Sequence, residues 1–258
     1  MTVTVKVLML NLISICNGDW DKIFKMVREK VQIDAKAEEE ISYTGNFISI
    51  VDDKMPVCMK RMARPSFGLF YLGDLKLLED DFIKIMFVGD DGKDEGVNDL
   101  MENLDNKFVF VLSEKTIEKR LPMIENHKVI LWSSTPLAQL DKNLINTIVN
   151  NGGLVFSEIP DSTTTITRDA RLRTTNAAYW SNYIAVVDGA RANASAAINY
   201  GLQGGATIGA LPRDYSTDSV NNKLIKDGAD CITSADDINE QFEDKFESQG
   251  LKDSHLNS

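Results

Sequence analysis

Short apolar runs separated by polar segments recur along most of the chain. The clearest is Ile83–Val88, which follows Asp80-Asp81 and precedes Gly89-Asp90-Asp91. Continuous apolar runs of this length, bounded by turn residues, are typical of strands buried on both faces. The same pattern predicts strands at residues 46–53, 108–112, 129–132, 154–157, 184–187 and 207–211, and residues 70–72 form an apolar run before a turn at Gly73 and Asp74.

Apolar residues at helical spacing lie between several of these strands, as at residues 140–149 and 194–202. Alternation of strand and helix is the signature of a parallel sheet with helices on both faces. The sequence therefore predicts an α/β fold with a Rossmann-like, mostly parallel sheet. Ligands of such sheets bind beyond the carboxyl ends of the strands.

The first part of the chain has a helical rather than a strand-like pattern. Phe24, Val27 and Val31 recur at three- and four-residue spacing and predict an amphipathic helix, capped by Asp19 or Asp21.

The end of the chain is mostly charged and predicts a short frayed helix or disorder. We therefore expect a small helical N-terminal segment (1–60), a Rossmann-like domain (61–240) and an acidic polar tail (241–258).

Charge is distributed unevenly along the 258 residues, which have a formal net charge of −11. A protein that coats nucleic acid non-specifically is usually basic, so the total charge argues against that function. The stretch from Arg168 to Lys226 nevertheless carries a net charge of +3, and the rest of the chain carries −14. This stretch is therefore the candidate for an anion contact.

Three further features bear on the cellular compartment. No apolar run approaches the ~18 residues that a membrane helix needs. The apolar residues 7–15 form too short a run for a secretion signal, and Ile15 is not the small residue that a cleavage site requires. Cys16, Cys58 and Cys231 lack metal-binding spacing and are typical of reduced thiols. We expect a cytoplasmic protein without a metal site.

Eight segments between residues 47 and 238 follow one another in the order found in a known family. LFYLGDLKLL (69–78) is similar to an LFYKGN-type element, IMFVG (85–89) to an AIVGSR strand, and GGLVFSEIP (152–160) to a G-LLSE-P element. The others are FISIVDD (47–53), IAVVD (184–188), ALP (210–212), NKLIKDGA (222–229) and TSADDI (233–238). Together they resemble the DprA (Smf) family of bacterial DNA-processing proteins.

The resemblance implies a Rossmann-like protein that binds single-stranded DNA, assists loading of the RecA recombinase in recombination or transformation, and forms a homodimer. It implies neither catalysis nor a cofactor. The winged helix that commonly ends the family is expected to be absent, because about 20 mostly polar residues follow Ile238.

The chain departs from the family pattern in the loops that would meet an anion. The GSR turn reads Gly89-Asp90-Asp91, the second strand is followed by Ser113-Glu114-Lys115 without glycine, and residues 191–195 also lack it. Glycine lets a backbone approach a phosphate closely. These departures favour an alternative function, that of a nucleotide-sensing or scaffold protein that has lost DNA binding.

The predicted DNA-binding residues are basic or amide side chains of the family's later motifs. Arg168, Arg171 and Arg173 replace a PRRNR patch, and arginine both binds phosphate bidentately and stacks on bases. Tyr179 and Trp180 follow and could stack on bases, or Trp180 could lie in the core. The remaining candidates are Arg191, Asn222 and Lys223, of which Asn222 could instead cap a helix.

Acidic residues after the strands have structural interpretations. Residues 89–92 are predicted to form a solvated turn, although Asp90, Asp91 and Asp94 could in principle hold a hard cation. Asp188 is expected to order its turn by accepting backbone hydrogen bonds.

Enzyme chemistry is poorly supported, because His127 and His255 are the only histidines and no Gly-x-Ser-x-Gly motif occurs. A nucleotide-cleaving enzyme is accordingly the least favoured function.

Overall fold

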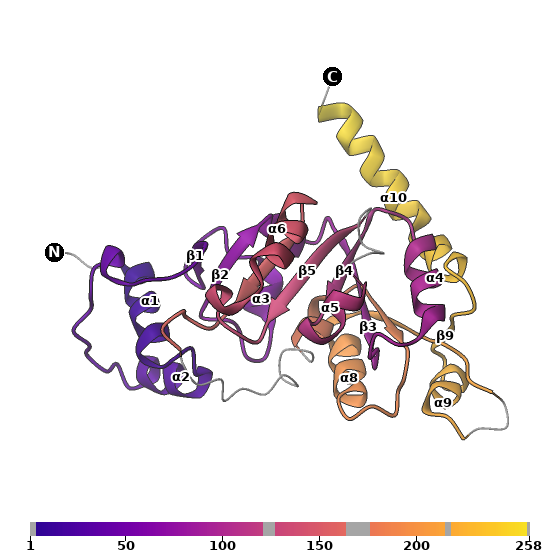
Figure 1. The fold of residues 1–258 in the computed structure, drawn as a ribbon, viewed down its shortest axis with the longest axis horizontal. Coiled ribbons are helices and arrows are strands. Elements are labelled where there is room, and N and C mark those ends of the chain that lie inside the picture. The colour runs from indigo at the N-terminus through magenta and orange to yellow at the C-terminus, as the bar shows by residue number, and fades with distance from the viewer. Residues whose placement is uncertain (1–3, 121–126, 164–175, 215–217, 257–258) are drawn as a thin grey trace. The chain divides into compact units, whose positions relative to one another are not determined.

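The computed structural model describes residues 4–120, 127–163, 176–214 and 218–256 (Figure 1). The chain divides into two units: unit 1 comprises Met1–Glu79 and Ile130–Arg173, and unit 2 comprises Asp80–Val129 and Thr174–Ser258. Each unit therefore combines two separate stretches of sequence. The three segments expected from the sequence, 1–60, 61–240 and 241–258, stay a prediction about domains.

Unit 1 begins with two helices, α1 (Val5–Ile15) and α2 (Trp20–Arg28). The Asp19 carboxylate accepts a hydrogen bond from the Lys22 N–H at 3.2 Å and caps α2, which confirms Asp19 rather than Asp21 as the cap. The helix ends at Arg28, before the predicted Val31, and Lys30 adopts a positive φ of 52°. A short 3₁₀ helix, η1 (Glu38–Glu40), follows.

The sheet strands of unit 1 occur in the order β1 (Asn46–Ser49), β2 (Gly68–Gly73), β6 (Leu154–Ser157) and β5 (Lys128–Ser133). β1 pairs antiparallel with β2, β2 antiparallel with β6, and β5 parallel with β6. The rings of Tyr43, Phe47 and Phe70 pack together against this sheet. The connecting helices of unit 1 are α3 (Val57–Arg61), η2 (Leu75–Leu78), η4 (Leu137–Gln139) and α6 (Lys142–Asn150).

Unit 2 contains an all-parallel arrangement in the order β4 (Phe108–Leu112), β3 (Ile83–Val88), β7 (Tyr183–Val186), β8 (Thr207–Ala210) and β9 (Asp230–Cys231). All six residues of β3 are buried, as the continuous apolar run predicted. Its helices are α4 (Glu95–Asn103), α5 (Glu114–Arg120), α8 (Ala194–Gly204), α9 (Val220–Lys226) and α10 (Asp236–Leu256). The predicted α/β fold with a mostly parallel sheet is confirmed.

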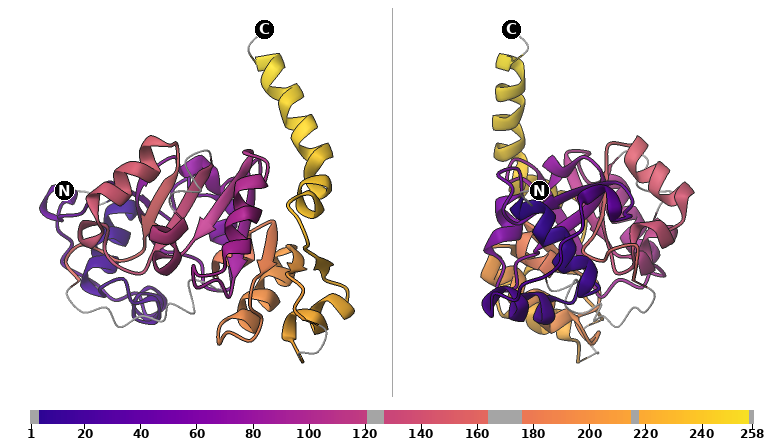
Figure 2. Two further views of the ribbon diagram at one scale, coloured as in Figure 1. Left: turned by 45° about the vertical axis from the view of Figure 1, so that its right-hand side comes forward. Right: turned by 90° about the vertical axis from the view of Figure 1, so that its left-hand side faces the viewer.

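The last helix differs from the short frayed helix or disordered tail that the composition predicted. α10 is continuous over 21 residues and extends away from the other elements of unit 2 (Figure 2). Phe242 and Phe246 are buried, and both contact the Phe108 ring edge-on, at centroid distances of 5.5 and 5.0 Å. Two well-placed rings anchor this helix because each buries a large apolar area. No helix in the described ranges is both long enough and apolar enough to cross a membrane.

The strand order of unit 2 reverses between β3 and β7. The chain leaves β3 through α4 toward β4 on one side, and leaves β7 through α8 toward β8 on the other. Right-handed crossovers that proceed in opposite directions place their helices on opposite faces of a sheet. The carboxyl ends of β3 and β7 therefore form the topological switch point, where α/β proteins bind ligands.

Gly89 brings the two loops of this switch point into contact. It has a φ of +79°, and a Cβ atom there would lie 2.1 Å from the Asp188 carbonyl oxygen. Gly205 has a similar φ of +87°, but a Cβ there would meet no described atom within 4 Å.

We predict that Gly89→Ala destabilises the fold more than Gly205→Ala. Both variants incur the cost of a left-handed alanine, about 1–2 kcal/mol, but only Gly89→Ala also forces two backbone segments apart. Urea denaturation of both variants measures the difference in the free energy of unfolding. Equal losses would show that the close approach at Gly89 is not a constraint.

Candidate functional site

A buried ion pair holds the loop that follows β3. Arg120, the last residue of α5, donates from Nη2 to Oδ1 of Asp90 at 2.6 Å and from Nε to Oδ2 at 3.0 Å. The two side chains are 1% and 2% exposed. The expectation that Asp90 lies in a solvated turn is therefore wrong, because its carboxylate points inward and has a cationic partner.

The same guanidinium satisfies further acceptors of this loop. Its Nη1 donates to the Asp94 carbonyl oxygen at 3.2 Å and to the side-chain oxygen of Asn98. A buried charge is stable only when it is paired and its remaining donors are bonded. Arg120 thereby fixes the path of the chain from β3 into α4. Arg120 is not predicted from the sequence, because its position at the end of a charged helix gives no sign that it is buried.

Arg191 is the predicted DNA-binding residue that lies at the switch point. Its Nη2 is 2.9 Å from Oδ2 of Asp91, and its Nε is 3.2 Å from Oδ2 of Asp188. The Arg191 side chain is 55% exposed. The guanidinium therefore joins the loop after β3 to the loop after β7, and it is accessible to solvent.

The carboxylates around Arg191 also order the backbone. Asp188 accepts a hydrogen bond from the Ala190 N–H at 3.0 Å, which confirms its predicted role in the turn. Desolvation alone would raise the pKa of Asp91, but the Lys93 N–H and the charges of Arg191, Lys93 and Lys119 outweigh it. The pKa of Asp91 consequently lies below its ordinary value, and the carboxylate is charged at neutral pH.

Arg213 is a second arginine at this edge, and the sequence did not single it out. It follows β8 and donates from Nη2 to the Val187 carbonyl oxygen at 2.6 Å, while Nη1 lies 3.7 Å from Oδ2 of Asp94. Its place after the segment ALP (210–212), at the carboxyl end of a parallel strand, was the signal that could have identified it.

Asn222 supports the loop of Arg213 and does not cap a helix. The cap of α9 is Ser219, whose hydroxyl oxygen accepts from the Asn222 N–H at 3.3 Å. The Asn222 side chain accepts from the Arg213 N–H at 2.9 Å and donates to the carbonyl oxygens of Arg213 and Asp214 at 3.0 and 3.4 Å. Asn222 therefore belongs to the site as a positioning residue.

The preceding residue, Asn221, joins the carboxyl ends of β7 and β8. Its side chain is buried, accepts from the Gly189 N–H at 2.8 Å, and donates to the carbonyl oxygens of Val186, Val187 and Leu211. Buried backbone groups need such partners, because leaving them unpaired is costly. Asn222 was among the predicted residues, but this neighbour was not.

The other predicted residues are placed less centrally. Lys223 lies on α9 and pairs with Asp218 at 2.8 Å, and its hydrogen bond and charge lower the pKa of that carboxyl. Trp180 is buried, which supports its interpretation as a core residue. Arg168, Arg171 and Arg173 lie outside the described residues.

The acidic residues of the loop after β3 each face a cation or a backbone donor. Asp90 pairs with Arg120 and Asp91 with Arg191, while Asp94 caps α4 by accepting from the Gly96 N–H. Within the described ranges, no group of three or more acidic, histidine or cysteine side chains is arranged to hold a metal ion. The arrangement is a paired cluster of arginines and aspartates at the switch point of unit 2.

Known proteins resemble this chain in sequence and in fold. The family model for DNA recombination-mediator protein A matches residues 133–243. No curated protein sequence matches the chain. The structure of DNA processing protein A (DprA) from Streptococcus pneumoniae is similar at a TM-score of 0.63 and 22% identity, covering 91% of this chain and 90% of that one.

A second similar structure is that of DNA processing protein A from Helicobacter pylori, which was determined for its single-stranded DNA binding mode. The match has a TM-score of 0.60 and 18% identity, and it covers 78% of this chain and 97% of the Helicobacter pylori chain. At these identities the two structures establish a shared fold, and the family model adds the sequence relationship over residues 133–243.

We predict that removing one residue of the buried ion pair costs much more stability than removing one residue of an exposed ion pair. Arg120→Met leaves Asp90 buried without its cation, and we expect a loss of about 3–5 kcal/mol in the free energy of unfolding. Arg191→Met, which breaks exposed pairs, should cost about 0–1 kcal/mol. Urea denaturation measures both values.

The double variant Asp90→Asn/Arg120→Met separates the cost of an unpaired buried charge from that of the lost contacts. It should recover part of the stability that Arg120→Met loses, because no unpaired charge remains buried. If Arg120→Met is no less stable than Arg191→Met, the pair does not organise this loop.

Proposed function

We propose that this chain is a divergent member of the DprA (Smf) family, that it binds single-stranded DNA, and that it catalyses no covalent step. The observation that carries the proposal is the exposed guanidinium of Arg191 at the switch point. We assign the contact to the predicted set, Arg168, Arg171, Arg173, Arg191, Asn222 and Lys223.

The ion pairs at this edge are compatible with exchange for phosphate. Exposed pairs such as Arg191 with Asp91 are weak, whereas arginine binds phosphate through two parallel charge-assisted hydrogen bonds. A DNA backbone can therefore displace the carboxylates. Asn222 acts indirectly, because it holds the loop on which Arg213 lies.

Family resemblance extends the proposal to partners. We propose that the protein assists RecA loading, forms a homodimer and resides in the cytoplasm. Assembly of RecA filaments on single-stranded DNA tests the first assignment, and sedimentation velocity tests the second.

A nucleotide-sensing or scaffold role is the second candidate function. It is favoured by Asp91, Asp94 and Asp188, which bring negative charge to the edge where a phosphate would bind. In this alternative the aspartates are permanent partners of Arg191 and Arg213, and DNA does not displace them.

We predict that labelled single-stranded oligonucleotide binds the protein with a negative slope of log K against log salt concentration. Arg171→Ala and Arg173→Ala should each weaken binding and make the slope shallower by about 0.7 for each phosphate that the variant no longer neutralises. Lys142→Ala, an exposed lysine at the start of α6, is the charge-matched control and should leave both quantities unchanged. Absence of binding at low salt would exclude the DNA-binding function and leave the scaffold role.

We also predict that Asp91→Asn strengthens oligonucleotide binding. The substitution removes a negative charge and frees one side of Arg191 for phosphate. Glu102→Gln, an exposed change of the same charge near the other end of α4, is the control. Fluorescence anisotropy at fixed salt measures both, and an unchanged or weaker affinity in Asp91→Asn would show that Arg191 does not contact DNA.

A further inference from the structure

At helix α2 of unit 1, two stacked aromatic rings are flanked by a cation at each end. Trp20 and Phe24 stack with their ring centroids 4.9 Å apart and their planes within 11° of parallel. The guanidinium carbon of Arg64 lies 5.0 Å from the Trp20 ring centroid, and that of Arg28 lies 5.9 Å from the Phe24 centroid. We refer to Arg64, Trp20, Phe24 and Arg28 as the α2 column.

The spacing of the sequence builds this column on one side of the helix. Trp20, Phe24 and Arg28 are four residues apart, and residues at that spacing are neighbours on a helix surface. The inner end is fixed, since the Trp20 Nε1–H donates to the Pro65 carbonyl oxygen at 2.8 Å and its ring contacts Phe67. The column is therefore a rigid platform at Trp20 and an open one at Phe24.

Phe24 is too exposed to serve mainly as a core residue. Its side chain is 43% exposed, whereas Ile23, the preceding residue of the helix, is 2% exposed and packs inward. Val27 and Val31, which follow Phe24, are also exposed. Exposed apolar surface bordered by charges commonly marks a binding site.

Cations surround the outer end of the column. Residues 20–31 carry a net charge of +2 in a chain whose total is −11. In the described part of the chain, Lys25 and Lys30 form no ion pair, and Arg28 has only Glu29 at 3.8 Å. Arg28 is 66% exposed, so it can leave the Phe24 ring when another group takes its place.

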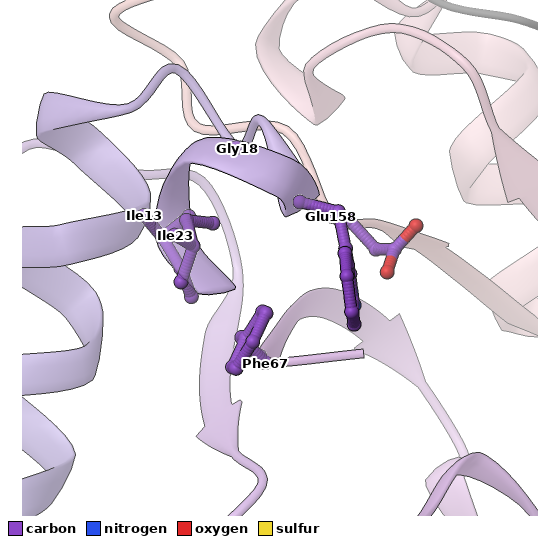
Figure 3. Close-up of a pocket in the computed structure, with 7 residues that line it drawn as sticks. Ile13, Gly18, Ile23, Phe67 and Glu158 are labelled. Atoms are coloured by element: carbon purple, nitrogen blue, oxygen red, sulfur yellow. The ribbon is translucent and has the colours of Figure 1, made fainter. Parts of the chain in front are cut away.

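A small recess lies beside Trp20. It is lined by Trp20, Ile23, Phe67 and Glu158 and has room for little more than a water molecule (Figure 3). The carboxylate of Glu158, one of the residues lining this recess, would repel a phosphate. This recess is too small for a nucleobase, whereas the exposed ring of Phe24 is accessible to one.

Exposed rings flanked by cations match single-stranded nucleic acid better than they match a protein partner. Single-stranded nucleic acid presents flat bases for stacking and phosphates for arginine and lysine. A protein partner would instead need an apolar surface to cover Phe24, Val27 and Val31, and would leave the unpaired lysines unused. The positive charge of this segment within an acidic chain favours the nucleic acid.

We infer that the α2 column is a base-stacking contact for single-stranded nucleic acid. A nucleobase stacks on the outer face of Phe24, and Arg28 and Lys25 bind the adjacent phosphates. This contact shares its ligand class with the proposed function but none of its residues, so each can fail separately.

The test uses the full chain with oligo(dT) as the probe and three substitutions of one residue. Phe24→Leu keeps an apolar side chain without a ring, Phe24→Ala removes most of it, and Phe24→Tyr keeps the ring. We expect Phe24→Leu and Phe24→Ala to weaken binding by at least about fivefold, and Phe24→Tyr to bind as the parent does, because one stacked base contributes that much or more.

Two further measurements support the interpretation. Trp20 is the least buried of the three tryptophans and reports stacking through quenching of its fluorescence, which Phe24→Leu should reduce. Leu202→Ala, at an exposed apolar position on α8, is the control and should bind as the parent does. Unchanged thermal melting of all four variants establishes that they are folded.

The outcomes separate the two sites. If Arg171→Ala and Arg191→Ala weaken binding while Phe24→Leu does not, the α2 column is not a contact and the proposed function stands. If Phe24→Leu weakens binding while the arginine variants do not, the column is the contact and the assignment to the switch point fails. Absence of any oligo(dT) binding overturns both. A change of oligomeric state in Phe24→Leu, with unchanged binding, identifies a protein interface and overturns the inference.

Discussion

The buried pair of Asp90 and Arg120 determines how the switch point of unit 2 is built. Two charges removed from water need partners for every remaining hydrogen-bonding group, and Arg120 meets this need by also bonding Asp94 and Asn98. These contacts therefore hold the loop between β3 and α4 in place. Asp91 and Asp94 extend from that loop, and their positions decide which arginines can gather at its outer side.

The exposed part of the edge has a different physical character. Arg191 and Arg213 join loops that follow β3, β7 and β8 through contacts with carboxylates and carbonyl oxygens. Such exposed contacts are weak and exchange with solvent ions. The edge therefore combines a fixed inner layer with an outer layer whose partners can change, which is the arrangement that a reversible polyanion site requires.

Most strands of the fold could be predicted because each is a short apolar run that ends in turn residues. Ile83–Val88 and Phe108–Leu112 have the predicted bounds, since burial on both faces leaves no room for polar residues in them. The length of α10 could not be predicted, because only Phe242 and Phe246 hold its first turns to the core and the average composition conceals them.

The candidate site was less predictable, because its geometry depends on residues far apart in sequence. Arg120 and Asp90 are 30 positions apart, and Arg191 and Asp91 are 100 apart. The family resemblance pointed to Arg191 and Asn222, but it did not reveal which side chains of the site are buried. Sequence alone could not separate Asn222 from Ser219 as the cap of α9, since both residue types favour that position.

The amide of Asn221 restricts how this protein can change over evolution. One end of its side chain accepts a hydrogen bond from Gly189, and the other donates to Val186, Val187 and Leu211. Aspartate has the same shape but would place a carboxylate against three carbonyl oxygens, and leucine would bond none of them. Related sequences should therefore keep asparagine here even where the arginines of the edge are replaced, so this position would preserve the record of common ancestry after the binding activity itself had diverged.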